Sequence, residues 1–215
     1  NLAAVWHNSE LKMYLTLLLG ASAIIAIDIM PAYGRNFFHA LRYSFFQVSS
    51  ILTSTGFATA DFNLWPQLSR TLLVGLMLIG GSPGSTAGGI KTTTLAVLLA
   101  NASASFHRQD SARLFGRRID NEAVRNAAAL LTLYLTLFLG GAVLISVLEG
   151  LPLASCLYET ASAVGTVGLT LGITPQLHIP SRLVLIALMY LGRVGGLTLI
   201  YAALSGGKKS AAKLP

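Results

Sequence analysis

The chain has 215 residues, of which 53% are hydrophobic and only 11% are charged. Soluble domains carry about 25% charged residues, so this composition predicts a membrane protein. The formal net charge of +7 would suit a nucleic-acid partner, but the basic residues do not alternate with aromatic ones. We therefore expect no nucleic acid.

Catalytic and metal-binding patterns are not found in the sequence. The single Cys156 excludes an intrachain disulfide framework, and the four histidines lie far apart in the sequence, at His7, His39, His107 and His178. We therefore expect no transition metal, no covalently bound cofactor and no enzymatic activity. The chain begins at Asn1 with no signal peptide, and we expect that an N-terminal part is missing.

Four segments have the length and apolar character of membrane spans, which need about 20 apolar residues. They are residues 11–30, 71–104, 126–148 and 182–204. The second segment is too long for one plain span and contains a glycine-rich loop. Between the spans, residues 37–52 and 153–164 form two semi-polar segments that are too short to cross, a length typical of re-entrant or interfacial helices.

Basic residues are distributed unevenly about these spans. Ten lie at one set of ends: Lys12, Lys91, Arg108, Arg113, Arg117, Arg118, Arg125, Lys208, Lys209 and Lys213; four lie at the other: Arg35, Arg42, Arg70 and Arg182. By the positive-inside rule, both termini and the loop 105–125 are cytoplasmic, and the short segments enter from outside. The basic loop serves either orientation alone or docking of a cytoplasmic partner.

An internal repeat relates the two halves of the chain. A shift of 112 residues superposes residues 50–86 on residues 162–198 without a gap, with ten identities in 37 positions. Each copy follows a span with a short helix, an extended loop and a second span, in the same direction along the chain. We therefore expect an all-α integral membrane fold with two tandem units, residues 1–104 and 126–205, separated by the cytoplasmic loop 105–125 and followed by a cytoplasmic tail, 206–215.

The segment after each short helix resembles a cation filter. These segments are Ser54-Thr55-Gly56-Phe57 and Thr166-Val167-Gly168-Leu169. Potassium-channel filters use TVGYG, in which backbone carbonyls replace the hydration shell of the ion. Glycine permits the backbone angles that this needs, and the carboxyl end of the preceding short helix favours a cation. Glycine turns in exposed loops would not explain the matching short helices.

The glycine-rich run between the two halves of the second segment allows two interpretations. It reads Gly80, Gly81, Ser82, Pro83, Gly84, Ser85, Thr86, Ala87, Gly88, Gly89, followed by Ile90 and Lys91. A phosphate-binding P-loop has its lysine one residue earlier and follows a strand in a soluble unit, so the match is poor. The glycines and proline instead predict a broken helix, which at membrane depth must be buried in protein or line a cavity. Residues 80–89 are thus expected to form an intramembrane gate, or alternatively a static kink.

Arg193 lies in the middle of the last predicted span, with about ten apolar residues on each side. An arginine near the bilayer centre costs at least about 2.5–3.5 kcal/mol on insertion scales, so it should face a cavity or a partner. We expect Ser82, Ser85 and Thr86 to provide the polar contacts that hold the glycine-rich loop closed against it.

Five motifs resemble the Trk/Ktr/HKT superfamily of potassium transporters: residues 54–58 (STGFA), 80–94 (GGSPGSTAGGIKTTT), 115–119 (FGRRI), 166–170 (TVGLT) and 191–199 (LGRVGGLTL). The second and third look most like the Ktr branch, whose membrane subunit is KtrB. The resemblance implies four such units around one pseudo-fourfold pore, of which this chain looks like the third and fourth. The missing N-terminal half, or another chain, would complete the pore.

The resemblance also implies roles and partners. It makes the carbonyls of Ser54, Thr55, Thr166 and Val167 ligands of K+, and it places Arg193 below the filter near the glycine-rich loop. It implies a K+ uptake subunit in a bacterial inner membrane, in contact with lipid, with Na+ as a transported or coupling ion left open. A homodimer and a cytoplasmic ring of nucleotide-binding regulatory subunits are implied, docking on 106–121 and 206–215. The alternatives are a secondary cation transporter, which predicts an inverted repeat, or a pump subunit with a phosphate-binding loop.

Overall fold

The computed structural model describes residues 9–108, 113–114 and 117–194. Its elements, in chain order, are α2 (Ser9–Ile29), η1 (Met30–Tyr33), α3 (Phe37–Leu52), η2 (Phe62–Leu64), α4 (Gln67–Leu78), α5 (Thr92–Phe106), β1 (Arg113–Leu114), β2 (Arg117–Arg118), α6 (Asn121–Glu149), α7 (Leu153–Val164), η3 (Thr174–Gln176) and α8 (Ile179–Val194). Over these described residues the fold is helical, as expected, apart from one antiparallel hairpin of two two-residue strands and one isolated β-bridge between Ile79 and Ile90. That hairpin lies in the predicted cytoplasmic loop, which is shorter than 105–125 because α5 and α6 extend into it.

The element boundaries repeat at the spacing of 112 residues seen in the sequence. The short helices α3 and α7 both end at equivalent positions, Leu52 and Val164, and the following single turns η2 and η3 are also equivalent. Helices α4 and α8 begin at the equivalent residues Gln67 and Ile179. The same order of long helix, short helix, single turn and helix therefore occurs twice.

Local capping explains several of these boundaries. The Asn36 side chain accepts hydrogen bonds from the backbone N–H groups of Phe38 and His39, at 3.1 and 3.3 Å, and so caps the start of α3. The start of α4 is held from another helix, because Asp28 Oδ2 accepts from Ser69 N at 3.0 Å and from Ser69 Oγ at 2.6 Å. Gly150 ends α6 with a left-handed φ of 66°.

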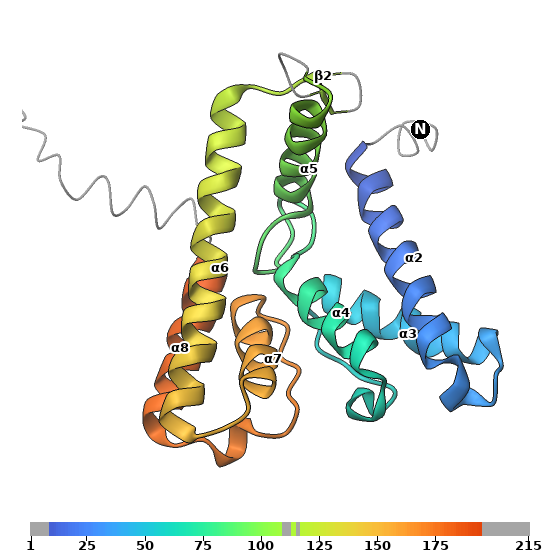
Figure 1. Ribbon diagram of the computed structural model, residues 1–215, viewed down its shortest axis with the longest axis vertical. Coiled ribbons are helices and arrows are strands. Elements are labelled where there is room, and N and C mark those ends of the chain that lie inside the picture. Colours follow the sequence, from blue (N-terminus) through green and yellow to red (C-terminus); the bar gives the residue numbers. More distant parts are fainter. Residues whose placement is uncertain (1–8, 109–112, 115–116, 195–215) are drawn as a thin grey trace, which may run out of the picture.

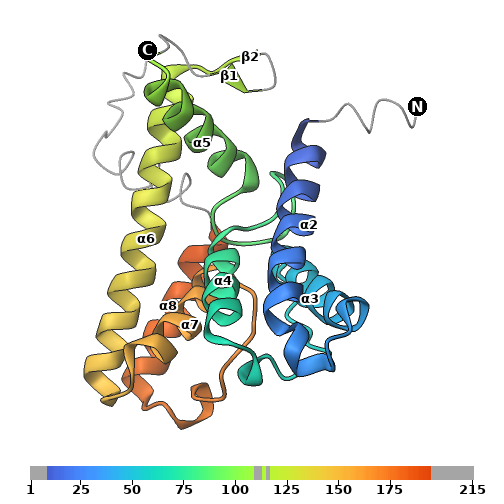
Figure 2. The same ribbon diagram turned by 45° about the vertical axis from the view of Figure 1, so that its right-hand side comes forward.

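The two repeats pack into one body. Figure 1 shows α6, α7 and α8 on one side and α2 and α3 on the other, with α4 between them. Figure 2 shows the same arrangement from a second direction, and α4 contacts both α7 and the α2–α3 pair. The stacked rings of Phe62 and Tyr158, with centroids 5.6 Å apart, join the first repeat to the second. Buried Ala161, Val167 and Leu169 of the second repeat also belong to the core of the first.

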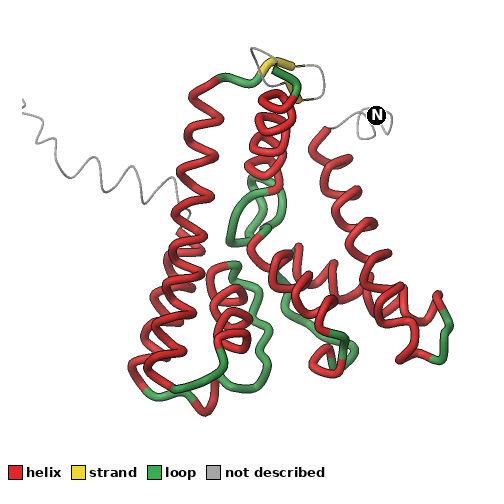
Figure 3. The backbone as a smooth tube through the Cα atoms, in the orientation of Figure 1, coloured by secondary structure: helices red, strands yellow, loops and turns green. Residues whose placement is uncertain are grey.

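Two described helices, residues 10–33 and 121–149, are long and apolar enough to cross a membrane by length and composition. Their outer faces carry exposed apolar side chains such as Ile27 on α2 and Val147 on α6, which are 62% and 77% exposed. The predicted second span is broken, because helical structure stops at Leu78 and resumes at Thr92 (Figure 3). The last predicted span, 182–204, is described only as far as Val194.

Candidate functional site

The two segments 54–57 and 166–169, called here the first and second loops, have the same unusual backbone. φ is positive at Ser54 (53°) and Gly56 (76°), and again at Thr166 (54°) and Gly168 (86°), but not at the residues between. Positive φ is costly for a residue with a side chain, so packing must hold Ser54 and Thr166 in place. A backbone that alternates the sign of φ turns successive N–H groups to one side, which leaves the carbonyl groups facing the other side. Each loop can therefore present a row of carbonyls.

The first and second loops lie directly against each other. A methyl group on Gly56 would lie 2.3 Å from the carbonyl oxygen of Val167, so only glycine fits there. The hydroxyl of Ser54 donates to the carbonyl oxygen of Gly165 at 3.2 Å. At Gly168, the equivalent of Gly56, no described residue lies within 4 Å of the corresponding position. The contact between the repeats is therefore head-to-tail.

The segment 80–89, called here the glycine loop, leaves α4 and enters α5 through a narrow neck. Gly80 N donates to the carbonyl oxygen of Ile90 at 2.7 Å, and Ile90 N donates to that of Leu78 at 2.9 Å. A methyl group on Gly80 would lie 1.9 Å from the carbonyl oxygen of Gly88. The ends of the loop are thus held together, while residues 83–86 between them are exposed.

Three contacts fix the glycine loop against the rest of the site. Gly88 N donates to Thr166 Oγ1 at 3.0 Å. The Arg193 guanidinium donates to the carbonyl oxygen of Thr86, and the Lys91 ammonium donates to that of Ala87. The first contact joins the glycine loop to the second loop, and the other two place cations on carbonyl groups of the glycine loop.

Two cavities meet at the glycine loop. One of about 450 Å³ is lined by Lys91, Tyr134 and Arg193, among others. The other, of about 580 Å³, is lined by Tyr14, Leu52 and Thr53, among others. Residues 85–87 of the glycine loop line both cavities. The loop therefore lies as a partition between them.

The structure brings the three predicted segments and Arg193 together, although they are up to 139 positions apart in the sequence, from Ser54 to Arg193. Of the three residues expected to make polar contacts with Arg193, Thr86 makes one through its backbone carbonyl, which accepts a hydrogen bond from the guanidinium. The P-loop alternative loses its structural context, since a helix, α4, precedes the loop where a P-loop needs a strand.

Two further residues of the site are not identified by the sequence analysis. Lys91 appears there as a topology signal and as the misplaced lysine of a P-loop, yet its ammonium holds the glycine loop. Glu159 lies in the short helix α7, is 4% exposed and accepts hydrogen bonds from the segment after the second loop. The signal was available, because an ionisable residue inside an apolar membrane segment is uncommon and usually functional.

Comparison with known proteins identifies the family. Residues 34–208 match the family described as TrkH, cation transport protein. This chain belongs to that family. The potassium/sodium uptake protein NtpJ of Enterococcus hirae is 41% identical over 155 residues, covering 70% of this chain and 34% of that protein. Ktr system potassium uptake protein B of Bacillus subtilis is 30% identical over 201 residues, covering 91% of this chain and 45% of that protein.

A solved structure shares the fold. The crystal structure of the potassium transporter TrkH from Vibrio parahaemolyticus aligns with a TM-score of 0.78 at 22% sequence identity, covering 92% of this chain and 44% of that one. The chain thus spans less than half the length of these relatives. The family resemblance seen in the sequence is confirmed, and the named relatives are uptake and transport proteins.

Proposed function

We propose that this chain forms two units of a membrane pore that passes K+ down its electrochemical gradient, with 1–104 and 126–205 as the units. The observation that carries the proposal is the pair of adjoining loops, 54–57 and 166–169, with the same alternation of φ. Backbone carbonyls presented in a row are the chemistry that replaces the hydration shell of K+. The names of the relatives, which describe potassium uptake, agree with this ion.

The proposed ligands of K+ are the carbonyls of Ser54, Thr55, Thr166 and Val167, with Gly56 and Gly168 as the filter glycines. Each loop has one glycine where the potassium-channel sequence TVGYG has two, since Ala58 and Thr170 stand at the second position. We therefore propose a filter that is less rigid than that of a channel, and Na+ remains a candidate second ion.

A complete pore needs more units than the two in this chain. The contact of Gly56 with Val167 is head-to-tail, and contacts of this kind build a ring only when further units close it. We propose that two more units, from the rest of the same protein or from another chain, close the ring beside Gly168. The relatives are longer than this chain, which covers 34–45% of their lengths, and this agrees with the proposal.

The glycine loop is proposed as the gate below the filter. It separates two cavities and is held by hydrogen bonds from Arg193, Lys91 and its own Gly88. The two cations beside the proposed ion path raise the electrostatic barrier for K+. A movement of the glycine loop would break its contacts with both cations. The alternative, a static kink, would not need this set of contacts.

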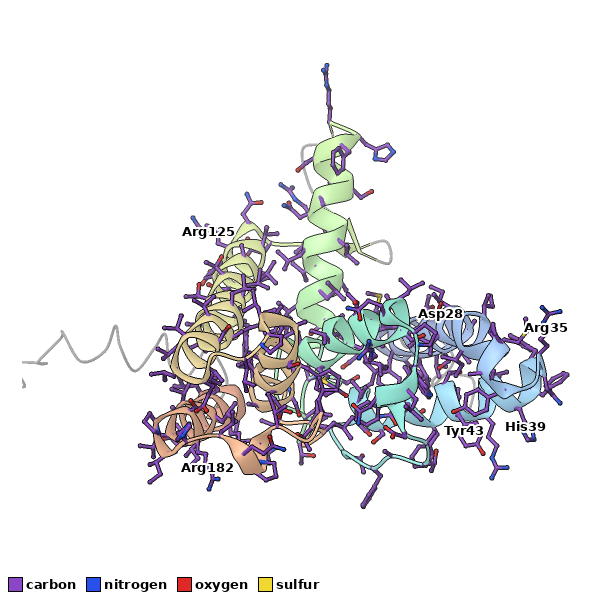
Figure 4. The ribbon with its side chains drawn as sticks, turned by 60° about the horizontal axis from the view of Figure 1, so that its bottom comes forward. Asp28, Arg35, His39, Tyr43, Arg125 and Arg182 are labelled. Atoms are coloured by element: carbon purple, nitrogen blue, oxygen red, sulfur yellow. The ribbon has the colours of Figure 1, made fainter. Side chains whose placement is uncertain are left out.

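The proposed setting is a bacterial inner membrane with both ends of this segment cytoplasmic and with α3 and α7 entering from outside. Arg125 lies near the start of α6 and Arg182 near the start of the antiparallel helix α8, so they lie at opposite ends of this pair (Figure 4). The cytoplasmic regulatory ring, docking on 106–121 and 206–215, and the homodimer rest on the family resemblance. The tail 206–215 lies outside the described residues.

Uptake of radioactive Rb+ by cells that lack their own K+ uptake and carry the full-length gene tests the proposal. Gly168 has a φ of 86°, so we expect Gly168→Ser to strain the second loop and to lower uptake by about tenfold or more. Gly140→Ser on α6, where nothing lies within 4 Å, is the matched control and should leave uptake near the wild-type level. Equal uptake by the two variants would count against a filter at Gly168.

The two alternative transport mechanisms fit the structure less well. A secondary transporter with a broken helix predicts an inverted repeat, in which equivalent helices run in opposite directions. Here the long helices that open the two repeats, α2 and α6, run in the same direction (Figure 1). A pump subunit needs a phosphate site, whereas the Lys91 ammonium binds the carbonyl of its own loop.

A further inference from the structure

Glu159 holds the segment that follows the second loop. Its Oε1 accepts hydrogen bonds from Thr170 Oγ1 at 2.6 Å and from Leu171 N at 2.9 Å, and its Oε2 accepts from Thr174 Oγ1 at 2.6 Å. The two hydroxyl contacts have the length of charge-assisted hydrogen bonds. One buried side chain on α7 thus fixes three residues, the first of which directly follows Leu169 of the second loop.

The first repeat has no equivalent arrangement. The position equivalent to Glu159 is Gln47, which is 1% exposed and whose Nε2 has no hydrogen-bond partner among the described residues. The residues equivalent to the two threonines are Ala58 and Phe62, which carry no hydroxyl group. The acid and its donors therefore occur together in the second repeat and are both replaced in the first.

Electrostatic balance supports a positioning role. Within the described part of the chain, the one salt bridge joins His178 to Glu149, so no described cation pairs with Glu159. Its charge is balanced by the hydroxyl groups and the backbone N–H that it binds. A buried carboxylate of this kind is costly unless its hydrogen bonds are complete, so the segment 170–174 is constrained to keep them.

We infer that Glu159 is a positioning residue that sets the ion preference of the second loop by fixing its outer end. This rests on the proposed function of that loop. Carbonyls held at a fixed spacing suit K+, whereas a loop free to contract can also close around the smaller Na+. Because the first loop lacks this support, discrimination between the ions depends more on the second loop than on the first.

The experiment compares the uptake of radioactive Rb+ and Na+ by cells that carry the full-length gene. We expect Glu159→Gln and Thr174→Val to lower the Rb+/Na+ uptake ratio by about threefold or more. Each substitution weakens a charge-assisted hydrogen bond, and part of the lost free energy should appear as a weaker preference for Rb+ over Na+. Gln47→Leu, a substitution of similar volume at the equivalent position of the other repeat, should leave the ratio unchanged. The amount of each variant in the membrane is measured by immunoblot.

Four outcomes decide the inference. Lowered ratios for Glu159→Gln and Thr174→Val, with an unchanged ratio for Gln47→Leu, support it. Wild-type ratios in both of the first two variants overturn it while leaving the proposed function intact. If Glu159→Gln does not accumulate in the membrane, Thr174→Val decides in the same way. Absence of Rb+ uptake by the wild-type protein overturns the proposed function and this inference with it.

Discussion

At the scale of single residues, glycine is placed where the backbone of one segment meets that of another. Gly56 lies against the Val167 carbonyl, Gly165 against that of Met77, and Gly192 against that of Val164, with 2.0–2.3 Å between an added methyl group and the oxygen. Such approaches bring backbone into contact with backbone, which no other residue type permits. Substitutions at these positions should therefore disturb the contact between repeats or between elements.

Gly56→Ala provides the residue-scale prediction. The added methyl group meets the Val167 carbonyl at 2.3 Å in a backbone with φ of 76°, so we expect a loss of about 2 kcal/mol or more in stability. Thermal unfolding of the full-length protein in detergent, together with Rb+ uptake, measures the effect, and both should fall.

Gly75→Ala is the control for that substitution. Gly75 lies in α4, with nothing within 4 Å of the added methyl group, and alanine favours a helix. Its melting temperature should equal or exceed that of the wild type. If the melting temperature of Gly56→Ala also equals or exceeds that of the wild type, the two loops do not approach each other as closely as described.

At the scale of elements, the break between α4 and α5 is the feature with the largest consequence. Its neck is fixed by backbone hydrogen bonds of Gly80 and Ile90, while its exposed middle is held by Lys91 and Arg193 through carbonyl groups. A segment held by a few hydrogen bonds at its middle and anchored at its ends is suited to local opening. Lys91 is also the N-cap residue that directly precedes α5, so a movement of α5 would be transmitted to the loop.

Lys91→Met tests this element. Methionine keeps most of the apolar stem but removes the ammonium that binds the Ala87 carbonyl. Because Lys91 is partly exposed, we expect the closed loop to lose about 1 kcal/mol, roughly fivefold in the ratio of open to closed states. Rb+ uptake per molecule should rise accordingly.

Lys12→Met is the matched control, because Lys12 is an exposed residue of α2. Its uptake should equal that of the wild type. Unchanged or reduced uptake in Lys91→Met, at equal protein levels, would contradict a gate held closed by Lys91.

At the scale of the whole molecule, two exposed arginines test the predicted orientation of the chain in a membrane. Arg35 lies by the start of α3, whereas Arg125 lies by the start of α6 (Figure 4). Both side chains are exposed. The positive-inside pattern predicts that the membrane separates them.

Cysteine labelling in intact cells measures this arrangement. We expect a membrane-impermeant thiol reagent to label Arg35→Cys in the full-length protein, and to label Arg125→Cys only after the cells are opened. The native Cys156 is fully buried, so background labelling should be low. Labelling of both variants in intact cells would exclude the proposed topology.

Much of the fold follows from local sequence. The short helices at 37–52 and 153–164, the break in the second span and the repeat at a spacing of 112 were all predicted, because apolar length, glycine content and periodicity are local properties. The family also followed from the motifs. The hairpin between α5 and α6 was not predicted, since two-residue strands have no periodic signal.

The sequence by itself determined that this is a repeated, helical, apolar chain of the Trk/Ktr type with two glycine-containing loops and a broken helix. Only the tertiary structure decided which groups meet: Thr166 with Gly88, Glu159 with Thr170 and Thr174, and Arg193 with the Thr86 carbonyl. Carbonyl groups occur at every residue, and a single lysine or glutamate has no sequence period. Their partners are therefore chosen by how the helices pack, and not by the local pattern of side chains.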